Sequence, residues 1–317
     1  MTLISFQQRE LLISDPQMQQ VLSLARKAAS SNATVLICGE SGTGKELVAR
    51  YIHEMSHRNS QPFLSINCAA IPEGLIEAEL FGYEKGAFTG AISQRIGIFE
   101  RAQGGSLLLD EVTEMPLHLQ AKFLRVIQEG EIDRLGGNKP VSLNTRLLAT
   151  SNQDVKKLVA QGRFREDLFY RLNVLTIDCP PLRKREEAIR NLSSFFIRRN
   201  AEKYGRSDLK ISEAALEVLV NHSWPGNVRE LANVVERAAL LNDTREIQKE
   251  EILKLVAFEN SPQSMDSLAS KSLASVEQIH IERVLINVGG NKTVAAKELG
   301  ISVRTLRNKL KQYALTS

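Results

Sequence analysis

A glycine-rich segment near the amino terminus has the residue types and spacing that bind phosphate. It follows a short β-rich apolar run at residues 34–38 and leads into an amphipathic helix expected to extend through about His53. The glycines let backbone N–H groups close around phosphate oxygens, the start of the helix adds partial positive charge, and Lys45 reaches the β- and γ-phosphates. This order predicts a P-loop, and a glycine turn that binds nothing is the alternative. The expected cofactor-binding residues are Gly39, Glu40, Ser41, Gly42, Thr43, Gly44, Lys45 and Glu46.

One position departs from the usual P-loop pattern. The residue after Lys45 is Glu46, where a Ser or Thr normally supplies a hydroxyl ligand to Mg²⁺. Another group or a water molecule must therefore complete the ligands of the metal ion.

A second apolar run, at residues 106–109, ends in two carboxylates, Asp110 and Glu111. This is the Walker B pattern, in which Asp110 is expected to hold Mg²⁺, through water, and Glu111 to polarise an attacking water. Alone the pattern is weak, because many strands end in solvated carboxylates. A doubly wound parallel sheet places both motifs at the same edge, so together they predict a nucleotide-hydrolysing α/β domain.

Two further segments extend this site. A third buried strand at residues 145–151 leads to Asn152, which is placed to sense the γ-phosphate or orient the water; an ordinary strand-end turn is the alternative. A mixed-charge stretch at residues 163–171 contains Arg165 and Arg171, and a solvated helix face is its ordinary interpretation.

Between the two nucleotide motifs lies a hexapeptide in which an aromatic residue and a hydroxyl stand between glycines. It reads Gly86-Ala87-Phe88-Thr89-Gly90-Ala91. With Gly82 upstream, three glycines fall within ten residues, which suits a protruding loop better than a continuous helix. A Phe on a loop is usually a core plug. The position of Phe88 between the nucleotide motifs instead indicates a moving part driven by nucleotide.

The composition excludes several classes. The chain has 317 residues, of which 43% are apolar and 25% charged, so it is long enough for two or three domains and is neither disordered nor fibrous. Its cysteines, Cys38, Cys68 and Cys179, have no metal-type spacing and are expected to be reduced and buried. There is no signal-peptide pattern and no apolar stretch near the length of a membrane span, so the cytoplasm is the expected location.

The net charge of +4 comes entirely from the carboxy-terminal segment. From Val276 onward there are seven basic and three acidic residues. A small basic module on a neutral body points to an acidic partner, most commonly DNA.

This basic segment has the pattern of three short helices. After an expected linker at residues 258–274, an amphipathic helix at 276–288 ends at two glycines, and Asn291 can cap a second helix. The first helix is expected to bury Val276, Ile279, Val284, Leu285 and Val288, and the second Val294, Ala295 and Leu299.

A tight turn at residues 300–302 leads to a third helix at 303–313 with Leu306 and Leu310 facing inward. Helix, short turn and basic helix predict a helix-turn-helix whose third helix enters the major groove of DNA. A small helical docking module is the alternative. The expected DNA-binding residues are Arg304, Thr305, Arg307, Asn308 and Lys311.

Taken together, the P-loop, the Asp-Glu strand end, the Asn strand end and the paired arginines resemble an AAA+ ATPase. The Gly86–Ala91 hexapeptide resembles one branch of it, the bacterial enhancer-binding activators of sigma-54 RNA polymerase, which commonly have Glu at the position of Glu46. The resemblance runs from about Ser14 to the carboxy terminus, where the run around Leu306 resembles the Fis type of helix-turn-helix. It implies ATP and Mg²⁺ as cofactors, a small helical lid subdomain, and a hexameric ring.

The resemblance also implies roles for individual residues. Arg165 and Arg171 correspond to arginine fingers that reach the γ-phosphate of the neighbouring subunit. Asn67 corresponds to a switch residue that holds the Glu111 carboxylate until ATP binds. Arg229, in the motif at residues 224–230, corresponds to the sensor II arginine. In that motif Asn227 is expected to cap a new helix, with Glu230 three residues later completing a capping box.

The hexapeptide is then the contact to sigma-54, rising when ATP is bound and falling back after hydrolysis. A turn-rich loop at residues 135–140 is expected beside it on the pore side of the ring. The expected partners are sigma-54 RNA polymerase, upstream enhancer DNA and copies of the chain itself, with the DNA-binding modules pairing through their first helices. No membrane partner is expected.

The expected domain boundaries are 1–13 for an amino-terminal extension, 14–178 for the α/β subdomain, 179–257 for the lid, 258–274 for the linker and 275–317 for the helix-turn-helix. The extension is too short for the regulatory domain that usually precedes the ATPase. Either a separate regulatory protein acts in trans, or the chain is a fragment.

A rival interpretation is a DNA-binding regulator whose ATPase domain serves only as an oligomerisation scaffold. Intact Lys45, Asp110 and Glu111 oppose it. An AAA+ unfoldase or helicase is disfavoured, because neither the hexapeptide nor the terminal helix-turn-helix fits one.

Overall fold

The computed structural model describes residues 15–206 and 208–260, and within the carboxy-terminal segment residues 281, 291, 292, 295, 296, 299 and 301–312. The chain divides into two compact units, Met1–Leu253 and Lys254–Ser317.

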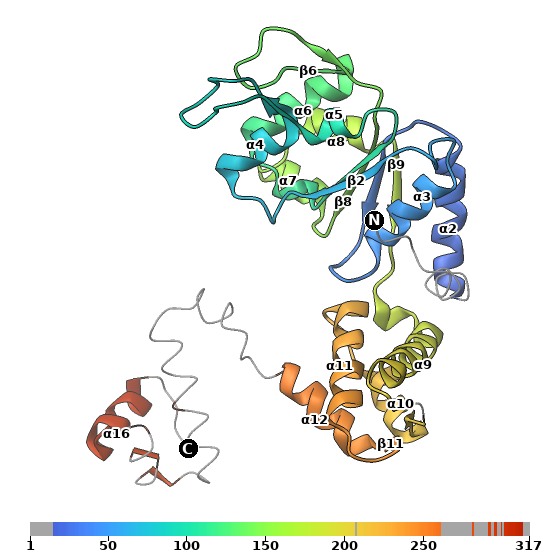
Figure 1. Ribbon diagram of the computed structural model, residues 1–317. Coiled ribbons are helices and arrows are strands. Elements are labelled where there is room, and N and C mark those ends of the chain that lie inside the picture. The colour runs from blue at the N-terminus through green and yellow to red at the C-terminus, as the bar shows by residue number, and fades with distance from the viewer. Residues whose placement is uncertain are drawn as a thin grey trace. The chain divides into compact units, whose positions relative to one another are not determined.

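A five-stranded parallel sheet forms the centre of the first unit (Figure 1). Its strands are adjacent in the order β2-β5-β8-β1-β9, which confirms the predicted doubly wound parallel sheet. The strands are β1 (Val35–Cys38), β2 (Phe63–Asn67), β5 (Ser106–Asp110), β8 (Arg146–Ser151) and β9 (Leu175–Asp178). All six residues of the central strand β8 are buried, as expected for a strand covered by helices on both faces.

Side chains that alternate along the strands build two separate cores. Val35 and Ile37 of β1 pack with Leu108 of β5 on one face, against α2 (Pro16–Ala29) and α3 (Lys45–Glu54). Leu36 of β1, and Leu107 and Leu109 of β5, face the opposite side of the sheet. That side is covered by α4 (Glu73–Phe81), α5 (Ile98–Arg101), α6 (Leu117–Glu129), α7 (Val155–Ala160) and α8 (Glu166–Leu172).

Two short hairpins lie beside each other. One is formed by β3 (Gly82–Tyr83) and β4 (Arg95–Ile96), the other by β6 (Glu131–Ile132) and β7 (Val141–Ser142). The Glu84 N–H donates to the Leu135 carbonyl at 2.9 Å, and the Leu135 N–H donates to the Gly82 carbonyl at 3.0 Å. The expected adjacency of the hexapeptide loop and the 135–140 loop is therefore confirmed.

Helices after β9 form a lid (Figure 1). They are η2 (Leu182–Lys184), α9 (Glu186–Lys203), α10 (Glu213–Asn221), α11 (Asn227–Leu241) and α12 (Lys249–Asn260), with a small sheet of β10 (Lys210–Ile211) and β11 (Glu246–Ile247). Trp224 is fully buried and its indole N–H donates to the Leu219 carbonyl at 2.7 Å. Helix α12 continues through Asn260, so residues 258–260, which were expected to belong to the linker, are helical.

The carboxy-terminal unit contains α16 (Val303–Gln312). Leu306 and Leu310 are buried in a small core with Ala295 and Ala296, as predicted for a third helix whose apolar side faces inward. Ile281 is also buried there, although the predicted apolar set of the first helix omitted it. The other apolar residues expected in that helix, and Val294, lie outside the described residues.

Ser302 starts α16. Its Oγ accepts the Thr305 N–H at 3.0 Å, and its hydroxyl lies 2.8 Å from that of Thr305. The Thr305 hydroxyl therefore takes part in the helix cap, rather than only facing outward as predicted. The side chains of Arg304, Arg307, Asn308 and Lys311 lie outside the described residues.

The part of the chain that the structure describes bears on the expected membrane and cysteine properties. No helix there has both the length and the apolar character needed to cross a membrane. All three cysteines are free thiols; Cys68 and Cys179 are buried, and Cys38 is half-buried.

A buried ion pair joins the amino-terminal helix to the lid. Asp15 caps α2 by accepting the Gln17 N–H at 2.9 Å, and its other carboxylate oxygen accepts from the Arg185 guanidinium at the start of α9. The two side chains are only 2% and 3% exposed. Loss of one partner would leave the other charge buried and unpaired.

We therefore expect Asp15→Ala to lower the free energy of unfolding by about 3–5 kcal/mol, measured by chemical denaturation. The control is Asp208→Ala, which removes an exposed ion pair with Arg245 and should cost at most about 1 kcal/mol. Equal small losses for both variants would show that the buried pair does not hold the lid helix.

Candidate functional site

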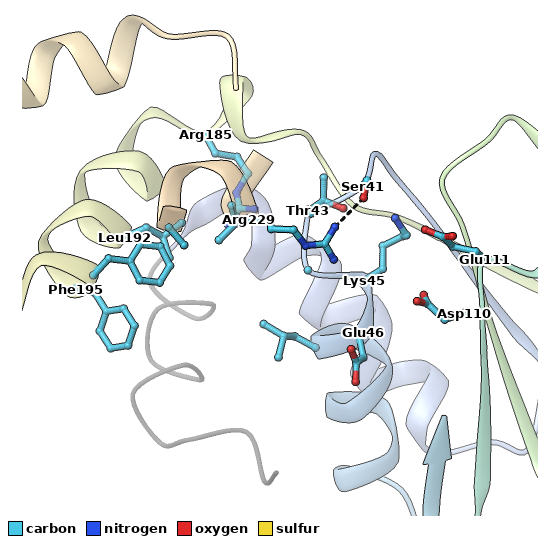
Figure 2. Close-up of a pocket in the computed structure, with 16 residues that line it drawn as sticks. Ser41, Thr43, Lys45, Glu46, Asp110, Glu111, Arg185, Leu192, Phe195 and Arg229 are labelled. Atoms are coloured by element: carbon cyan, nitrogen blue, oxygen red, sulfur yellow. Dashed lines mark hydrogen bonds between the residues drawn. The ribbon is translucent and has the colours of Figure 1, made fainter. Parts of the chain in front are cut away.

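The P-loop, the Asp-Glu strand end and the lid line one pocket (Figure 2). Lys45, Asp110 and Glu111 gather on one side of it, and Arg229 of the lid reaches in from the other. The parallel sheet is the cause, because β1 and β5 both end at its carboxyl edge.

Glycine is required in this loop for two reasons. Gly44, which precedes α3, has a φ of 100°, in the left-handed region. Gly42 has a φ of 78°, and a Cβ there would lie 2.3 Å from the Gly226 carbonyl oxygen. The lid backbone thus approaches the loop too closely for any side chain at Gly42.

Lys45 lies inside the loop. Its side chain is buried, and its ammonium donates to the carbonyls of Gly39 at 2.7 Å and Glu40 at 3.0 Å. Burial lowers the pKa of Lys45, and the nearby Asp110 carboxylate opposes that shift. The Thr43 hydroxyl closes the turn by donating to the Glu40 carbonyl at 2.8 Å. Lys45 is therefore held at the centre of the loop, where a phosphate chain would sit.

Glu46, the departure from the usual pattern, also lines the pocket. Its carboxylate is 53% exposed and pairs with Arg50 one turn along α3 at 3.0 Å. The pair holds Glu46 on the surface of the helix, at the edge of the pocket.

Asp110 is fixed by both of its carboxylate oxygens. The Asn67 amide donates to Oδ2 at 2.9 Å, and the Thr150 hydroxyl donates to Oδ1 at 2.5 Å. The expected partner of Asn67 was Glu111, so this structure corrects that pairing. The β2–β5 register gives the reason, because it places Asn67 directly opposite Asp110.

Glu111 has an unusual backbone. Its φ is 53°, in the left-handed region that non-glycine residues rarely adopt, and its N–H donates to the Thr150 hydroxyl at 2.9 Å. Thr150 was missed by the sequence reasoning, which considered only Asn152. The strand register brings Thr150 to the site, because Leu109 pairs with Ala149 and the continuation of that register sets Asp110 beside Thr150.

Gly39, Glu40 and Asn67 do not line this pocket but bind residues that do. Three other residues predicted for the nucleotide site lie away from it. Asn152, Arg165 and Arg171 are exposed and are not among the residues that line it. Arg165 instead pairs with Asp167, with a closest distance of 2.7 Å, and that bond raises the pKa of Arg165. In one subunit, therefore, the two arginines do not join the site.

The lid contacts the P-loop through the start of α11. The Arg229 guanidinium donates to the Ser41 hydroxyl at 3.0 Å (Figure 2). The fully buried Asn227 donates to the Ser41 carbonyl at 2.9 Å, and its carbonyl oxygen accepts the Leu182 N–H at 2.8 Å.

The predicted capping box is thus only half correct. Glu230 does reach back, accepting the Gly226 N–H at 2.7 Å, but the Asn227 side chain makes no capping bond. Asn227 is the first residue of α11, and its side chain joins the lid to the P-loop instead.

Glu40 adds a charged contact between loop and lid. Its two carboxylate oxygens accept from the two terminal nitrogens of Arg183 at 2.7 and 2.8 Å. The hydrogen bond from Arg183 is the main reason that the pKa of Glu40 falls to about 2. The Arg183 guanidinium thus favours the ionised form of Glu40.

The far end of the pocket is apolar. It is lined by Leu47, Leu192, Phe195, Phe196, Val228 and Ala232. Sequence reasoning missed these residues, because an apolar helical pattern does not distinguish a core position from a pocket wall. One cavity thus offers an apolar wall suited to a heterocyclic base and a charged end suited to a phosphate chain.

The charged end also fits Mg²⁺. Among the described residues, no group of three or more His, Cys, Asp or Glu side chains could hold a metal ion. Mg²⁺ does not need one, since it is commonly bound by one or two carboxylates together with substrate phosphates. Asp110 and Glu111 beside Lys45 supply such a donor set.

The hexapeptide forms a closed turn at the end of its hairpin. The Gly86 N–H donates to the Ala91 carbonyl at 2.9 Å, and Ala91 is buried. Phe88 is 47% exposed and packs edge-on against Tyr83, with 4.9 Å between ring centroids. Thr89 beside it is exposed. The core-plug alternative for Phe88 is therefore wrong, and the turn presents both side chains to solvent.

Three protein families match the chain in succession. Residues 11–178 match the sigma-54 interaction domain, residues 183–269 the AAA+ ATPase lid domain, and residues 272–313 the Fis family of bacterial regulatory proteins.

Similar proteins cover almost the whole chain. The transcriptional regulatory protein FlbD of Caulobacter vibrioides is 50% identical over 97% of this chain and 71% of its own length. The regulatory protein AtoC of Escherichia coli is 45% identical over 98% of this chain and 69% of its own length. The crystal structure of NtrX from Brucella abortus in complex with ATP superposes with a TM-score of 0.72, at 35% identity, covering 94% of this chain and 68% of that one. With its three domain matches in this order, the chain belongs to the family of sigma-54-dependent AAA+ transcriptional regulators with a Fis-type helix-turn-helix.

Proposed function

We propose that this protein activates transcription by remodelling the closed complex of sigma-54 RNA polymerase with the energy of ATP hydrolysis, as a hexameric ring bound to upstream enhancer DNA. The observation that carries the proposal is the convergence of Lys45, Asp110, Glu111 and Arg229 on one pocket. These residues supply the charges that phosphoryl transfer requires. The NtrX structures with ATP and with ADP support nucleotide as the ligand.

Each group in the pocket has a role that its position supports. Lys45 and Arg229 bind and orient the phosphates, and the apolar wall around Phe195 holds the base. Asp110, fixed at both oxygens, is the residue that would hold Mg²⁺. When bound, that ion would neutralise the charge that develops on the phosphates. Glu111 accepts a proton from the attacking water or orients it.

Arg165 and Arg171 act on the neighbouring subunit. Both are exposed and lie outside the pocket of their own chain, which supports a role in trans. Arg165 must then exchange Asp167 for a γ-phosphate, an exposed ion pair that is inexpensive to break. A ring of subunits follows, because each site is completed by the next one. Asn152 senses the γ-phosphate from the end of β8.

The hexapeptide Gly86–Ala91 contacts sigma-54. Phe88 and Thr89 are exposed at the tip of a hairpin that hydrogen-bonds to the neighbouring 135–140 loop, so the two loops move together. Tight binding alone cannot open a stable closed complex, since a ligand shifts an equilibrium only by its differential affinity. A cycle of ATP turnover supplies that work.

The carboxy-terminal module binds enhancer DNA, as a dimer on a palindromic site, through Arg304, Thr305, Arg307, Asn308 and Lys311. The burial of Leu306 and Leu310 in the core of this module supports the proposal, because a recognition helix packs its apolar side against its own domain. We further propose that a separate regulatory protein controls this one in trans. The proposed location is the cytoplasm.

The second candidate is a DNA-binding regulator whose ATPase domain is only an oligomerisation scaffold. It predicts that the pocket need not turn over ATP. Lys45 is buried and held in the loop by two hydrogen bonds. This placement favours the hydrolytic function over the scaffold candidate.

We expect Glu111→Gln to reduce ATP turnover at least about a hundredfold, because the amide cannot accept a proton from water. ATP affinity should be retained. Phosphate release and binding of a fluorescent ATP analogue measure the two properties. Glu114→Gln, an exposed change three residues away, is the control that should hydrolyse normally. Normal turnover in Glu111→Gln would favour the scaffold candidate.

Thr89→Ala should hydrolyse ATP within about twofold of the unmodified protein and yet fail to open promoters, because only the contact to sigma-54 is removed. A promoter-opening assay with purified sigma-54 polymerase tests this. The control is Ser60→Ala, which removes an exposed hydroxyl near the amino end of β2 and should open promoters normally. Normal opening by Thr89→Ala would refute the contact assignment.

Replacing Arg304 and Arg307 together by Ala should weaken binding to the protein's own DNA sites at least about tenfold, since each arginine contact to DNA contributes about 1–3 kcal/mol. ATP turnover should not change. Binding is measured on genomic fragments that the unmodified protein selects. Arg245→Ala, in an exposed position of the lid, is the matched control. Unchanged DNA affinity would indicate the docking-module alternative for this segment.

A further inference from the structure

We propose that the Thr150 hydroxyl is a positioning group for both carboxylates of the hydrolytic site. This inference rests on the proposed ATPase function and names a residue that the function did not require. It concerns how Asp110 and Glu111 are held, rather than a group that touches the nucleotide.

One hydroxyl serves the two acidic residues at once. It donates its proton to Asp110 Oδ1 at 2.5 Å and accepts the backbone N–H of Glu111 at 2.9 Å. A hydroxyl has one proton and two lone pairs, so both bonds form together. Thr150 itself is fully buried in the central strand β8, so the sheet fixes the position of its oxygen.

The bond to Asp110 leaves that side chain with a single orientation. Asn67 holds Oδ2 at 2.9 Å, and Thr150 holds Oδ1. The two partners come from the strands on either side of β5, and the Cys68 N–H also binds the Asp110 backbone carbonyl at 2.9 Å. Without the hydroxyl, only the Asn67 bond would restrict the carboxylate.

The bond to Glu111 acts on its backbone. Glu111 stands in the left-handed region, with φ 53° and ψ 50°, between the end of β5 and the short helix η1 (Val112–Glu114). A residue keeps such a conformation only where its surroundings enforce it. The Glu111 N–H reaches the Thr150 oxygen in this conformation, so the hydroxyl helps to hold the turn that directs the Glu111 side chain.

Thr150→Val tests the proposal, because valine has nearly the same shape and lacks the hydroxyl. Groups that orient acidic ligands commonly contribute 10- to 100-fold to activity, so we expect the kcat for ATP hydrolysis to fall about 10- to 100-fold. The KM for ATP should change less than about threefold, because the P-loop and lid contacts remain. Thr150→Ser, which keeps the hydroxyl, should restore kcat to within about threefold of the unmodified protein.

A binding measurement gives a readout that does not depend on turnover. Affinity for a fluorescent ATP analogue is measured with Mg²⁺ and with chelator. The unmodified protein and Thr150→Ser should bind more tightly with Mg²⁺, and Thr150→Val should lose most of that gain, because Asp110 is no longer oriented.

Thr145→Val is the matched control. It removes a hydroxyl at the opposite end of the same strand segment, where Thr145 donates to the Phe99 carbonyl at 3.3 Å. Its kcat and its Mg²⁺ dependence should match those of the unmodified protein. Thermal melting without nucleotide reports whether each variant folds, and if Thr150→Val does not, Thr150→Ala takes its place with the same expected loss.

Three results would overturn the proposal. These are unchanged kcat and Mg²⁺ dependence in the hydroxyl-free variant, an equal loss in Thr150→Ser, or a loss confined to KM. A failure of the proposed function looks different. In that case the unmodified protein itself does not hydrolyse ATP, and the Mg²⁺-dependent binding still decides whether Thr150 orients Asp110.

Discussion

A phosphate-binding loop must keep its backbone N–H groups available for the ligand, so its carbonyl groups need other partners. In this protein the lid and one lysine supply them. The Lys45 ammonium donates to the carbonyls of Gly39 and Glu40. From the lid, the Asn227 amide donates to the Ser41 carbonyl, and the Val228 N–H donates to the Gly42 carbonyl at 3.0 Å. The loop is thereby held open toward the pocket. Because two of these four carbonyl groups, those of Ser41 and Gly42, are bound by the first residues of α11, a movement of the lid alters the loop directly.

Side-chain contacts also connect the phosphate-binding loop to the lid. Glu40 is bound to Arg183 and the Ser41 hydroxyl to Arg229, so two neighbouring residues of the loop each have a lid partner. A phosphate chain that draws Lys45 or Arg229 toward itself must break some of these bonds. Under the proposed function, an exchange of these hydrogen bonds for bonds to the nucleotide would couple nucleotide binding to the position of the lid.

At the opposite side of the pocket the acidic pair is supported in a different manner. Asp110 and Glu111 are held by neighbouring strands, which a packed parallel sheet keeps rigid. The site therefore combines a fixed acidic half with a phosphate-binding half that depends on the lid. This division would suit the proposed ATPase, which must position water accurately and also convert nucleotide state into movement.

The sequence alone determined the fold class and most of the site, because the relevant signals are local. Glycine spacing before Lys45, an apolar run ending in Asp110, and the leucines four residues apart in the third helix are each patterns within a few residues. Tertiary structure decided which side chains meet. Strand register paired Asn67 with Asp110 instead of Glu111 and brought in Thr150, and the close approach of lid and loop turned Asn227 from a helix cap into a bridge. Those contacts join residues from 40 to nearly 190 positions apart, and no local pattern specifies which of them lie opposite each other.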